Sequence, residues 1–296
     1  MRAGGFQICF NQSEDVFSLP GAAGRAYGRF GFPPPPPGRP HICANFVQSL
    51  DGVVSFRDRP GQTGGEVIAR SSADRWLAAM IRAHQDAILL GAGTLRAERG
   101  RDGRGFDYAA LPAAWRAYRR KQGWTPLRVV VLTRSGQLDP EHRVFRAEAP
   151  PVLIATTEAG ARRLRRLPRL RATILAPSRG MAVRPRALAA QLRREHGIQR
   201  LLCEAGPEVY AQWMEAGLID EDFRTIALQV TGESPRGAPR RPTAYGGLSF
   251  LPVTAPWFQM ISLHTARPSH LFLRLRRRRA PSPMRARLAS APTLAG

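Results

Sequence analysis

The sequence of 296 residues has few cysteines, almost no lysine and no long apolar run. Its three cysteines, Cys9, Cys43 and Cys203, are far apart and odd in number, which excludes a disulfide framework and a Cys-x-x-Cys metal site. No stretch is apolar for long enough to cross a bilayer, and the first residues lack the basic-then-apolar order of a signal peptide. We therefore expect a cytoplasmic protein that has no membrane partner.

The formal net charge of +23 comes almost entirely from arginine, because Lys121 is the only lysine. Clustered cations would favour nucleic acid as a partner. The arginines are instead spread over every segment, as a compositional bias would spread them, so we do not expect a nucleic-acid surface. The one basic run, residues 274–279, precedes a tail rich in Ala, Pro and Ser. We interpret this run as a solvated, disordered end, with a tail that touches RNA or lipid as the alternative.

Several catalytic motifs are absent from the sequence. It contains no GxSxG elbow, no HExxH helix, no GxxxxGK[ST] loop and no GxGxxG turn. It also lacks the His-x-Glu and Pro-Cys-x-x-Cys pair of zinc deaminases. These absences argue against acyl-transfer hydrolysis, P-loop chemistry, zinc-dependent deamination and standard Rossmann binding, and we expect no metal site.

Apolar runs and helical periodicity alternate along the chain from residue 39 onward. The pattern predicts strands, with helices between most of them, over residues 41–47, 87–90, 127–132, 152–156, 172–175 and 200–203. Strands separated by helices favour a mostly parallel sheet with helices on both faces. Two later strands, 258–265 and 270–275, are joined by a hairpin-like turn, so we expect an α/β fold whose mixed sheet has an antiparallel C-terminal edge.

Composition divides the chain into three regions. Residues 1–38 have few apolar repeats and include five consecutive prolines, so we expect a low-order N-terminal extension with a polyproline spacer. Residues 39–276 form the predicted catalytic domain. Residues 277–296 are expected to be a basic, Pro/Ala-rich disordered tail.

Two glycine turns each follow a predicted strand and open a helix, at residues 91–94 (GAGT) and 204–207 (EAGP). Glycine lets a ligand approach the backbone, and the unpaired N–H groups of a first helical turn attract phosphate. One such turn is an ordinary connection in an α/β domain. Two turns could hold the two phosphates of a dinucleotide.

Polar and charged residues follow other predicted strands. In residues 133–135 (TRS), an arginine flanked by hydroxyls could bind a phosphate. The alternative, a solvated arginine in a polar turn, is equally well supported by the sequence. Asp51, Glu98 and Glu204 lie beside the turns. Such carboxylates suggest hydrogen-bond partners for a substrate, although a loop carboxylate is more often only solvated.

The chain resembles the reductase domain of bacterial riboflavin biosynthesis in four segments that occur in the same order: QSLDG (48–52), HQDAILLGAGTLRAE (84–98), VVVLTRSG (129–136) and LLCEAGPEVYAQWMEAGLIDE (201–221). The resemblance covers about residues 40–276. It implies a dihydrofolate reductase-like fold, a homodimer and a stand-alone pyrimidine reductase. The implied reaction uses NADPH to reduce the ribosyl group of 5-amino-6-(5-phosphoribosylamino)uracil to ribityl.

The same resemblance implies roles for individual residues. It places the pyrophosphate and nicotinamide of NADPH at Gly91, Gly93, Thr94, Ala205 and Gly206. It places the adenosine 2′-phosphate at Thr133, Arg134 and Ser135. It places the phosphorylated pyrimidine substrate at Asn45, Ser49, Glu98 and Glu204. The implied catalytic carboxylates are Asp51, Glu98 and Glu204.

The chain departs from the family pattern at three of these positions. Asn45 stands where the family often has lysine, Glu98 where aspartate is usual, and Ala205 where glycine is common. Losing the lysine weakens contact with a substrate phosphate, and arginine-rich insertions at 99–126 and 231–247 could reshape the pocket. Two alternatives therefore stay open: a same-fold NADPH reductase acting on another pterin-like or carbonyl substrate, and a degenerate reductase scaffold with a basic interaction tail.

Overall fold

The computed structural model describes residues 5–14, 16–56, 64–67, 71–97, 108–145, 152–168, 170–178, 180–234, 236–266 and 269–278. Its strands are β1 (Phe6–Asn11), β2 (His41–Ser49), β3 (Ala87–Gly91), β4 (Arg128–Leu132), β5 (Val152–Ala155), β6 (Ala172–Leu175), β7 (Arg200–Cys203), β8 (Glu221–Ala227), β9 (Phe258–Ala266) and β10 (His270–Arg277). Its helices are α1 (Gly21–Tyr27), α2 (Gly64–Val67), α3 (Ser72–Ala83), α4 (Ala92–Ala97), α5 (Ala113–Lys121), α6 (Glu158–Leu164), α7 (Pro185–His196) and α8 (Pro207–Glu215), with a 3-10 turn at Arg143–Phe145.

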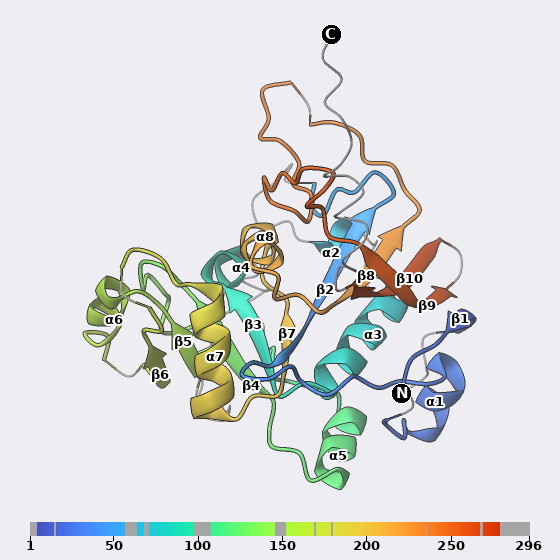
Figure 1. Cartoon of the computed structure of the whole chain (residues 1–296), viewed down its shortest axis with the longest axis horizontal. Coiled ribbons are helices and arrows are strands. Elements are labelled where there is room, and N and C mark those ends of the chain that lie inside the picture. Colours follow the sequence, from blue (N-terminus) through green and yellow to red (C-terminus); the bar gives the residue numbers. More distant parts are fainter. Residues whose placement is uncertain are drawn as a thin grey trace.

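The described strands form one sheet in the order β1-β9-β10-β8-β2-β7-β3-β4-β5-β6 (Figure 1). From β8 to β6 every neighbouring pair is parallel, whereas β8-β10, β10-β9 and β9-β1 are antiparallel. This order confirms the predicted α/β class, with a mostly parallel sheet and an antiparallel edge built from the C-terminal strands.

Helices cover both faces of the sheet, as the alternation of strands and helices predicted. α3 and α5 lie on one face of the sheet, and α7 and α8 lie on the other (Figure 1), so their side chains belong to two separate core clusters. β3 is buried along its whole length because it lies in the middle of the parallel part, which explains its uninterrupted apolar sequence.

Local sequence signals set the helix ends. The Ser71 hydroxyl accepts a hydrogen bond from the Asp74 backbone N–H and so caps α3, and Thr157 caps α6 in the same way. α7 begins with Pro185 and ends at Gly197, whose φ of 64° is the left-handed conformation that glycine adopts most easily. Within the described ranges, no helix has the length and apolar character needed to cross a membrane.

The N-terminal region differs from the expectation of a low-order extension over residues 1–38. β1 pairs with β9 and forms the end of the sheet, with Phe6 opposite Ala266. Tyr27 and Phe30 are at most 1% exposed, and Phe32 is buried beside them. This segment contains six aromatic residues, and a few such large side chains bury enough surface to order it without a regular repeat.

The basic run at 274–279 also differs from the prediction of a solvated end. Arg274 lies in β10 and is fully buried, with its Nε 2.7 Å from Oε2 of the equally buried Glu221. Arg274 also donates to the Ser13 hydroxyl and to the Gly31 carbonyl, at 3.2 and 2.5 Å. A buried guanidinium is tolerated because a carboxylate and further oxygens satisfy it. The part of the expected tail from residue 279 lies outside the described residues.

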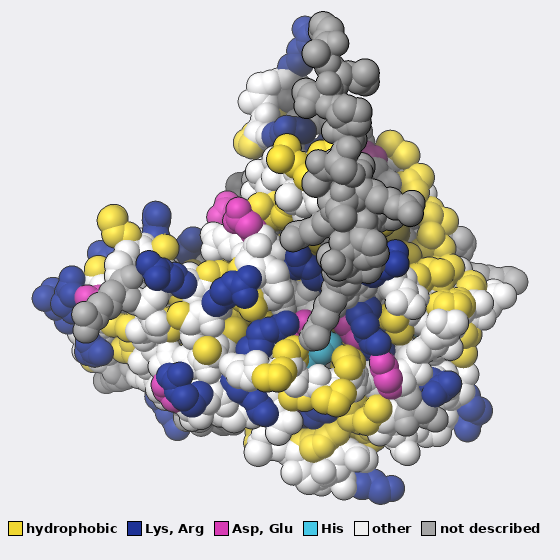
Figure 2. Space-filling view, viewed as in Figure 1, with side chains coloured by type: hydrophobic (Ala, Val, Ile, Leu, Met, Phe, Trp, Pro, Cys, Tyr) yellow, Lys and Arg dark blue, Asp and Glu magenta, His cyan; other side chains and the backbone are white. Residues whose placement is uncertain are grey.

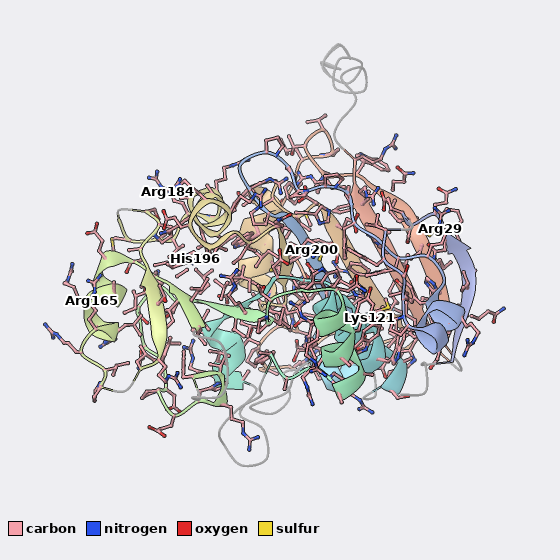
Figure 3. All side chains as sticks on the ribbon, turned by 90° about the horizontal axis from the view of Figure 1, so that it is seen from below. Arg29, Lys121, Arg165, Arg184, His196 and Arg200 are labelled. Atoms are coloured by element: carbon pink, nitrogen blue, oxygen red, sulfur yellow. The ribbon has the colours of Figure 1, made fainter. Side chains whose placement is uncertain are left out.

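The remaining positive charge is dispersed. On the face shown in Figure 2, basic side chains lie among uncharged and apolar ones instead of forming one stripe. Arg29, Lys121, Arg165 and Arg184 come from four separate segments and extend outward at different places on the molecule (Figure 3). Arg200, by contrast, packs inside the molecule, with its guanidinium 4.9 Å from the Trp124 ring centre.

A chain that begins at Arg39 is expected to be much less stable than the full chain. Its truncation removes the Ser13 and Gly31 oxygens from buried Arg274 and removes Glu14 from Arg276, which it binds through two bonds of 2.6 and 2.7 Å. Each lost charged hydrogen bond costs about 1.5–3 kcal/mol. Urea denaturation should show a lower free energy of unfolding, and Glu14→Gln should show part of the loss while exposed Glu215→Gln shows none. An unchanged unfolding midpoint after truncation would contradict the structure of this region.

Candidate active site

The carboxyl ends of β2, β7, β3 and β4 meet at one edge of the sheet, in that order. β7 pairs with β2 on one side and with β3 on the other, and Cys203 lies opposite both Ala44 and Leu89. The ladder continues one residue further, because the Glu204 N–H donates to the Leu89 carbonyl at 3.0 Å. The two glycine turns that follow β3 and β7 are therefore neighbours.

Space beside these turns is left open by glycine. A methyl group built on Gly91 would lie 3.5 Å from Val209 Cγ2, and one on Gly206 would lie 3.7 Å from Thr94 Oγ1. Both are ordinary van der Waals distances, and neither glycine is among those with a positive φ. A methyl on Gly93 would meet nothing within 4 Å. Packing within the described protein therefore does not demand glycine here, and the bare backbone suits the close approach of a ligand.

The start of α8 is suited to an anion. Gly206 is its N-cap residue and Pro207 its first residue, so no side chain caps the helix and no N–H is present at that first position. An uncapped first turn attracts a phosphate group. α4 has only six residues, so the 91–94 turn contributes backbone groups and the Thr94 hydroxyl more than a helix dipole.

The loop after β4 is fixed by the start of α6. The Thr157 hydroxyl donates to the Arg134 carbonyl at 2.9 Å and also accepts from the Gly160 N–H at 3.1 Å. The Gly136 N–H in turn donates to the Thr133 hydroxyl, at 3.2 Å. The loop backbone is thus held in place.

The side chain of Arg134 projects from this fixed loop. It is exposed, and its guanidinium has no hydrogen bond or ion pair with any residue that the structure describes. Ser135 is also exposed, and its hydroxyl accepts only a local bond from the Gln137 N–H. A rigid loop that presents a free guanidinium and a hydroxyl is a suitable phosphate contact.

Glu204 is held by two side chains. Arg82 Nε lies 2.8 Å from Oε2 of Glu204, and Asn45 Nδ2 lies 3.3 Å from Oε1. The Glu204 side chain is only 8% exposed, so these donors compensate for the burial of its charge. Asn45, which replaces a lysine of the family pattern, thus orients a carboxylate.

Asp51 is engaged with the loop that follows β8. Its carboxylate accepts from the buried Ser49 hydroxyl at 2.5 Å and from the backbone N–H groups of Thr231 and Gly232, at 3.2 and 2.8 Å. Desolvation raises the pKa of Asp51, but these hydrogen bonds outweigh it and hold the pKa below its ordinary value. The carboxylate therefore stays ionised and fastens the loop to the end of β2.

The loop between β8 and β9 continues across the start of α8. Val54 N–H donates to the Pro242 carbonyl at 2.9 Å. Gly246 has a positive φ of 44°, and a methyl group on it would lie 2.8 Å from the Pro207 carbonyl oxygen.

Glu98, the third predicted carboxylate, lies outside the described residues. In the part of the chain that the structure does describe, no three His, Cys, Asp or Glu side chains are grouped so as to hold a metal ion.

The segment that contains these turns and carboxylates is similar to a known protein family. The family model of the RibD C-terminal domain matches residues 40–242. The chain belongs to this family. β1, α1, β9 and β10 lie outside the matched range, so part of the sheet is not covered by the family model.

Two archaeal relatives carry the name 2,5-diamino-6-ribosylamino-4(3H)-pyrimidinone 5′-phosphate reductase. The protein from Methanothermobacter thermautotrophicus is 28% identical over 196 residues, covering 66% of this chain and 80% of the relative. The protein from Archaeoglobus fulgidus is 27% identical over 186 residues, covering 62% and 78%. A solved pyrimidine reductase-like protein from Corynebacterium diphtheriae superposes with a TM-score of 0.66 at 20% identity, covering 81% of this chain and 93% of its own.

These comparisons confirm two predictions. The chain is a member of the pyrimidine reductase family of riboflavin biosynthesis, a family of oxidoreductases. Its fold is the predicted dihydrofolate reductase-like α/β fold.

Sequence reasoning missed two residues that organise the site of this family member. Arg82 lies in the last turn of α3, where a basic residue reads as solvated, and its partner is 122 residues away. Thr157 could have been found, because a threonine directly after a predicted strand and before a predicted helix is a helix-cap signal. Its second role, holding the Arg134 carbonyl, depends on how β4 and β5 pair.

Gly160→Ala is expected to destabilise the protein by displacing the loop after β4. A methyl group there would lie 2.0 Å from Thr156 Oγ1 and 2.9 Å from the Arg134 carbonyl, so the loop and the threonine must move. Overpacking of this kind costs about 1–3 kcal/mol. Urea denaturation measures the loss, and Gly24→Ala in α1, whose methyl would come no closer than 3.6 Å to its neighbours, serves as the control. Equal stability of both variants would mean that the loop is not fixed as described.

Proposed function

We propose that this protein is an NADPH-dependent reductase that converts the ribosyl group of a phosphorylated 5-amino-6-ribosylaminopyrimidine to a ribityl chain. The observation that carries the proposal is the adjacency of the two glycine turns, with a free arginine on the next strand end. The family supplies the class of reaction. The sequence resemblance implied the uracil form of the substrate, whereas the archaeal relatives are named for a 2,5-diamino form.

The cofactor-binding residues in this proposal are those that the resemblance implied. Gly91, Gly93, Thr94, Ala205 and Gly206 would lie against the pyrophosphate and nicotinamide, because the backbone there is open to close approach. Thr133, Arg134 and Ser135 would bind the 2′-phosphate. Bound NADPH would supply the hydride, and the chain would supply its orientation.

The proposed roles of the carboxylates follow from their partners. Glu204 keeps one fixed orientation between Arg82 and Asn45, so it can accept a hydrogen bond from a substrate hydroxyl or amine. Asp51 and Ser49 would act through the loop that they fasten, by shaping the substrate side of the site. Glu98 is retained as a proposed catalytic and substrate-binding residue on the resemblance alone. A homodimer remains part of the proposal on the same ground.

Turnover is the direct test of the proposed function. Purified protein should oxidise NADPH when either ribosylaminopyrimidine 5′-phosphate is added, and mass spectrometry should find a product heavier by two hydrogens. The control is cofactor titrated without substrate. Saturable NADPH binding without turnover on either ring would reject this substrate class, and absence of binding would reject the reductase function.

Arg134→Ala is expected to weaken NADPH much more than NADH. The lost charge-assisted contact with the 2′-phosphate corresponds to about 1–3 kcal/mol, or about fivefold to 150-fold in Kd, and NADH lacks that phosphate. Fluorescence titration with both cofactors measures the difference, with Arg184→Ala, an exposed arginine of another segment, as the control (Figure 3). Equal loss for both cofactors would remove Arg134 from the 2′-phosphate site.

A further inference from the structure

Asp74 is a buried carboxylate to which no role has yet been given. It lies in the first turn of α3 and is only 8% exposed. Its Oδ1 accepts a hydrogen bond of 2.7 Å from the hydroxyl of Thr225 in β8. Its Oδ2 has no hydrogen-bond partner among the residues that the structure describes. Oδ2 is not among the fully buried atoms that lack a partner in the described part of the chain, so it is open to solvent or to a ligand.

Asp74 lies on the same side of the sheet as the side chains that hold Glu204. Thr225 pairs with Val47 in parallel register, so both face α3, and Asn45 precedes Val47 by two residues and faces the same way. Asn45 binds Glu204 on that side.

The charge of Asp74 interacts with the charges of the same group. Burial raises the pKa of Asp74 above its ordinary value, and the Thr225 hydrogen bond opposes this only in part. Among more distant charges, Glu204 raises this pKa, and His270 and Arg82 lower it. Asp74 and Glu204 therefore interact electrostatically with each other, and Arg82, which binds Glu204, interacts with both.

The two candidate substrates differ at ring position 2. The 2,5-diamino-4-pyrimidinone ring carries an amino group there, so its N3–H and 2-amino groups are two neighbouring donors. Uracil carries an oxygen at that position and presents one donor, N3–H, beside one acceptor. An ionised carboxylate only accepts hydrogen bonds, so it can pair twice with the first ring and once with the second, with repulsion between oxygens in the second case.

We propose that Asp74 is a specificity-determining residue, which binds the N3–H and 2-amino edge of a 2-amino-4-oxopyrimidine. This inference rests on the proposed function and narrows its substrate to the diamino ring. The free Oδ2 accepts one ring N–H, and Oδ1 accepts the other beside the Thr225 hydroxyl, because a carboxylate oxygen has two lone pairs. Thr225 is a positioning residue that fixes the direction of the carboxylate.

The kinetic test compares kcat/KM for the two ribosylaminopyrimidine 5′-phosphates in the wild type and in Asp74→Asn. The wild type should prefer the diamino ring at least tenfold. An amide offers one donor and one acceptor, which match uracil, so Asp74→Asn should shift the ratio towards uracil by about tenfold to a hundredfold. Glu195→Gln, which removes an exposed carboxylate on α7, should leave the ratio unchanged. A wild-type preference for uracil, or a ratio unaffected by Asp74→Asn, would overturn the inference.

A binding test needs neither cofactor nor turnover. Calorimetric titration with 2,5,6-triaminopyrimidin-4-one and 5,6-diaminouracil, the two bare bases, should show tighter binding of the triamino base in the wild type and a reversed order in Asp74→Asn. This order without turnover would reject the proposed reaction while supporting the inference on the ring. Turnover on both phosphates with equal affinity for the bases would leave the reaction standing and overturn the inference.

Thr225→Val provides a second variant that keeps Asp74 itself. Loss of the hydroxyl frees Oδ1 from its 2.7 Å bond, so the preference for the diamino ring should fall by about threefold to tenfold, less than in Asp74→Asn. Circular dichroism checks that both variants are folded. If Asp74→Asn does not fold, an unchanged preference in folded Thr225→Val counts against the inference.

Discussion

The position of β7 between β2 and β3 is the constraint on which the site depends. Because all three strands are parallel, their carboxyl ends meet at one edge, and each loop that follows contributes to the same region. Glu204 directly follows β7, and the neighbouring strand β2 supplies Asn45 as its partner. The two glycine turns lie side by side because the strands that precede them, β3 and β7, are paired. The candidate site residues are thus concentrated where these parallel strands end.

Much of the architecture could be predicted because its signals are local. The strand, glycine turn and helix at 200–215 are contiguous in the sequence, so apolar periodicity identifies them together. The order of the N-terminal segment could not be predicted in this way, because the segment is held by Arg274, which lies more than 240 residues later. From the sequence alone, a run of arginines is predicted to be solvated, because the apolar periodicity does not indicate which carboxylate will pair with it in the folded protein.

The site was predicted unevenly for the same reason. The turns 91–94 and 204–207 were found from their own sequences, and the structure makes them neighbours. Asp51 was expected beside a substrate, but the structure shows it bound to Thr231, 180 residues away. Asp74 gave no signal, because an aspartate in the first turn of a helix is normally a favourable charge at the helix start. Only the tertiary contact with Thr225 reveals a carboxylate that is buried and half satisfied.

The pairing of β1 with β9 joins the two ends of the described chain. During synthesis the first strand leaves the ribosome long before its partner, since Phe6 pairs with Ala266. The aromatic residues of the N-terminal segment therefore stay exposed to solvent at least until β9 has been synthesised. Contacts of such long range form slowly and expose apolar surface while they form. We therefore expect the N-terminal segment to reach its final structure late in folding.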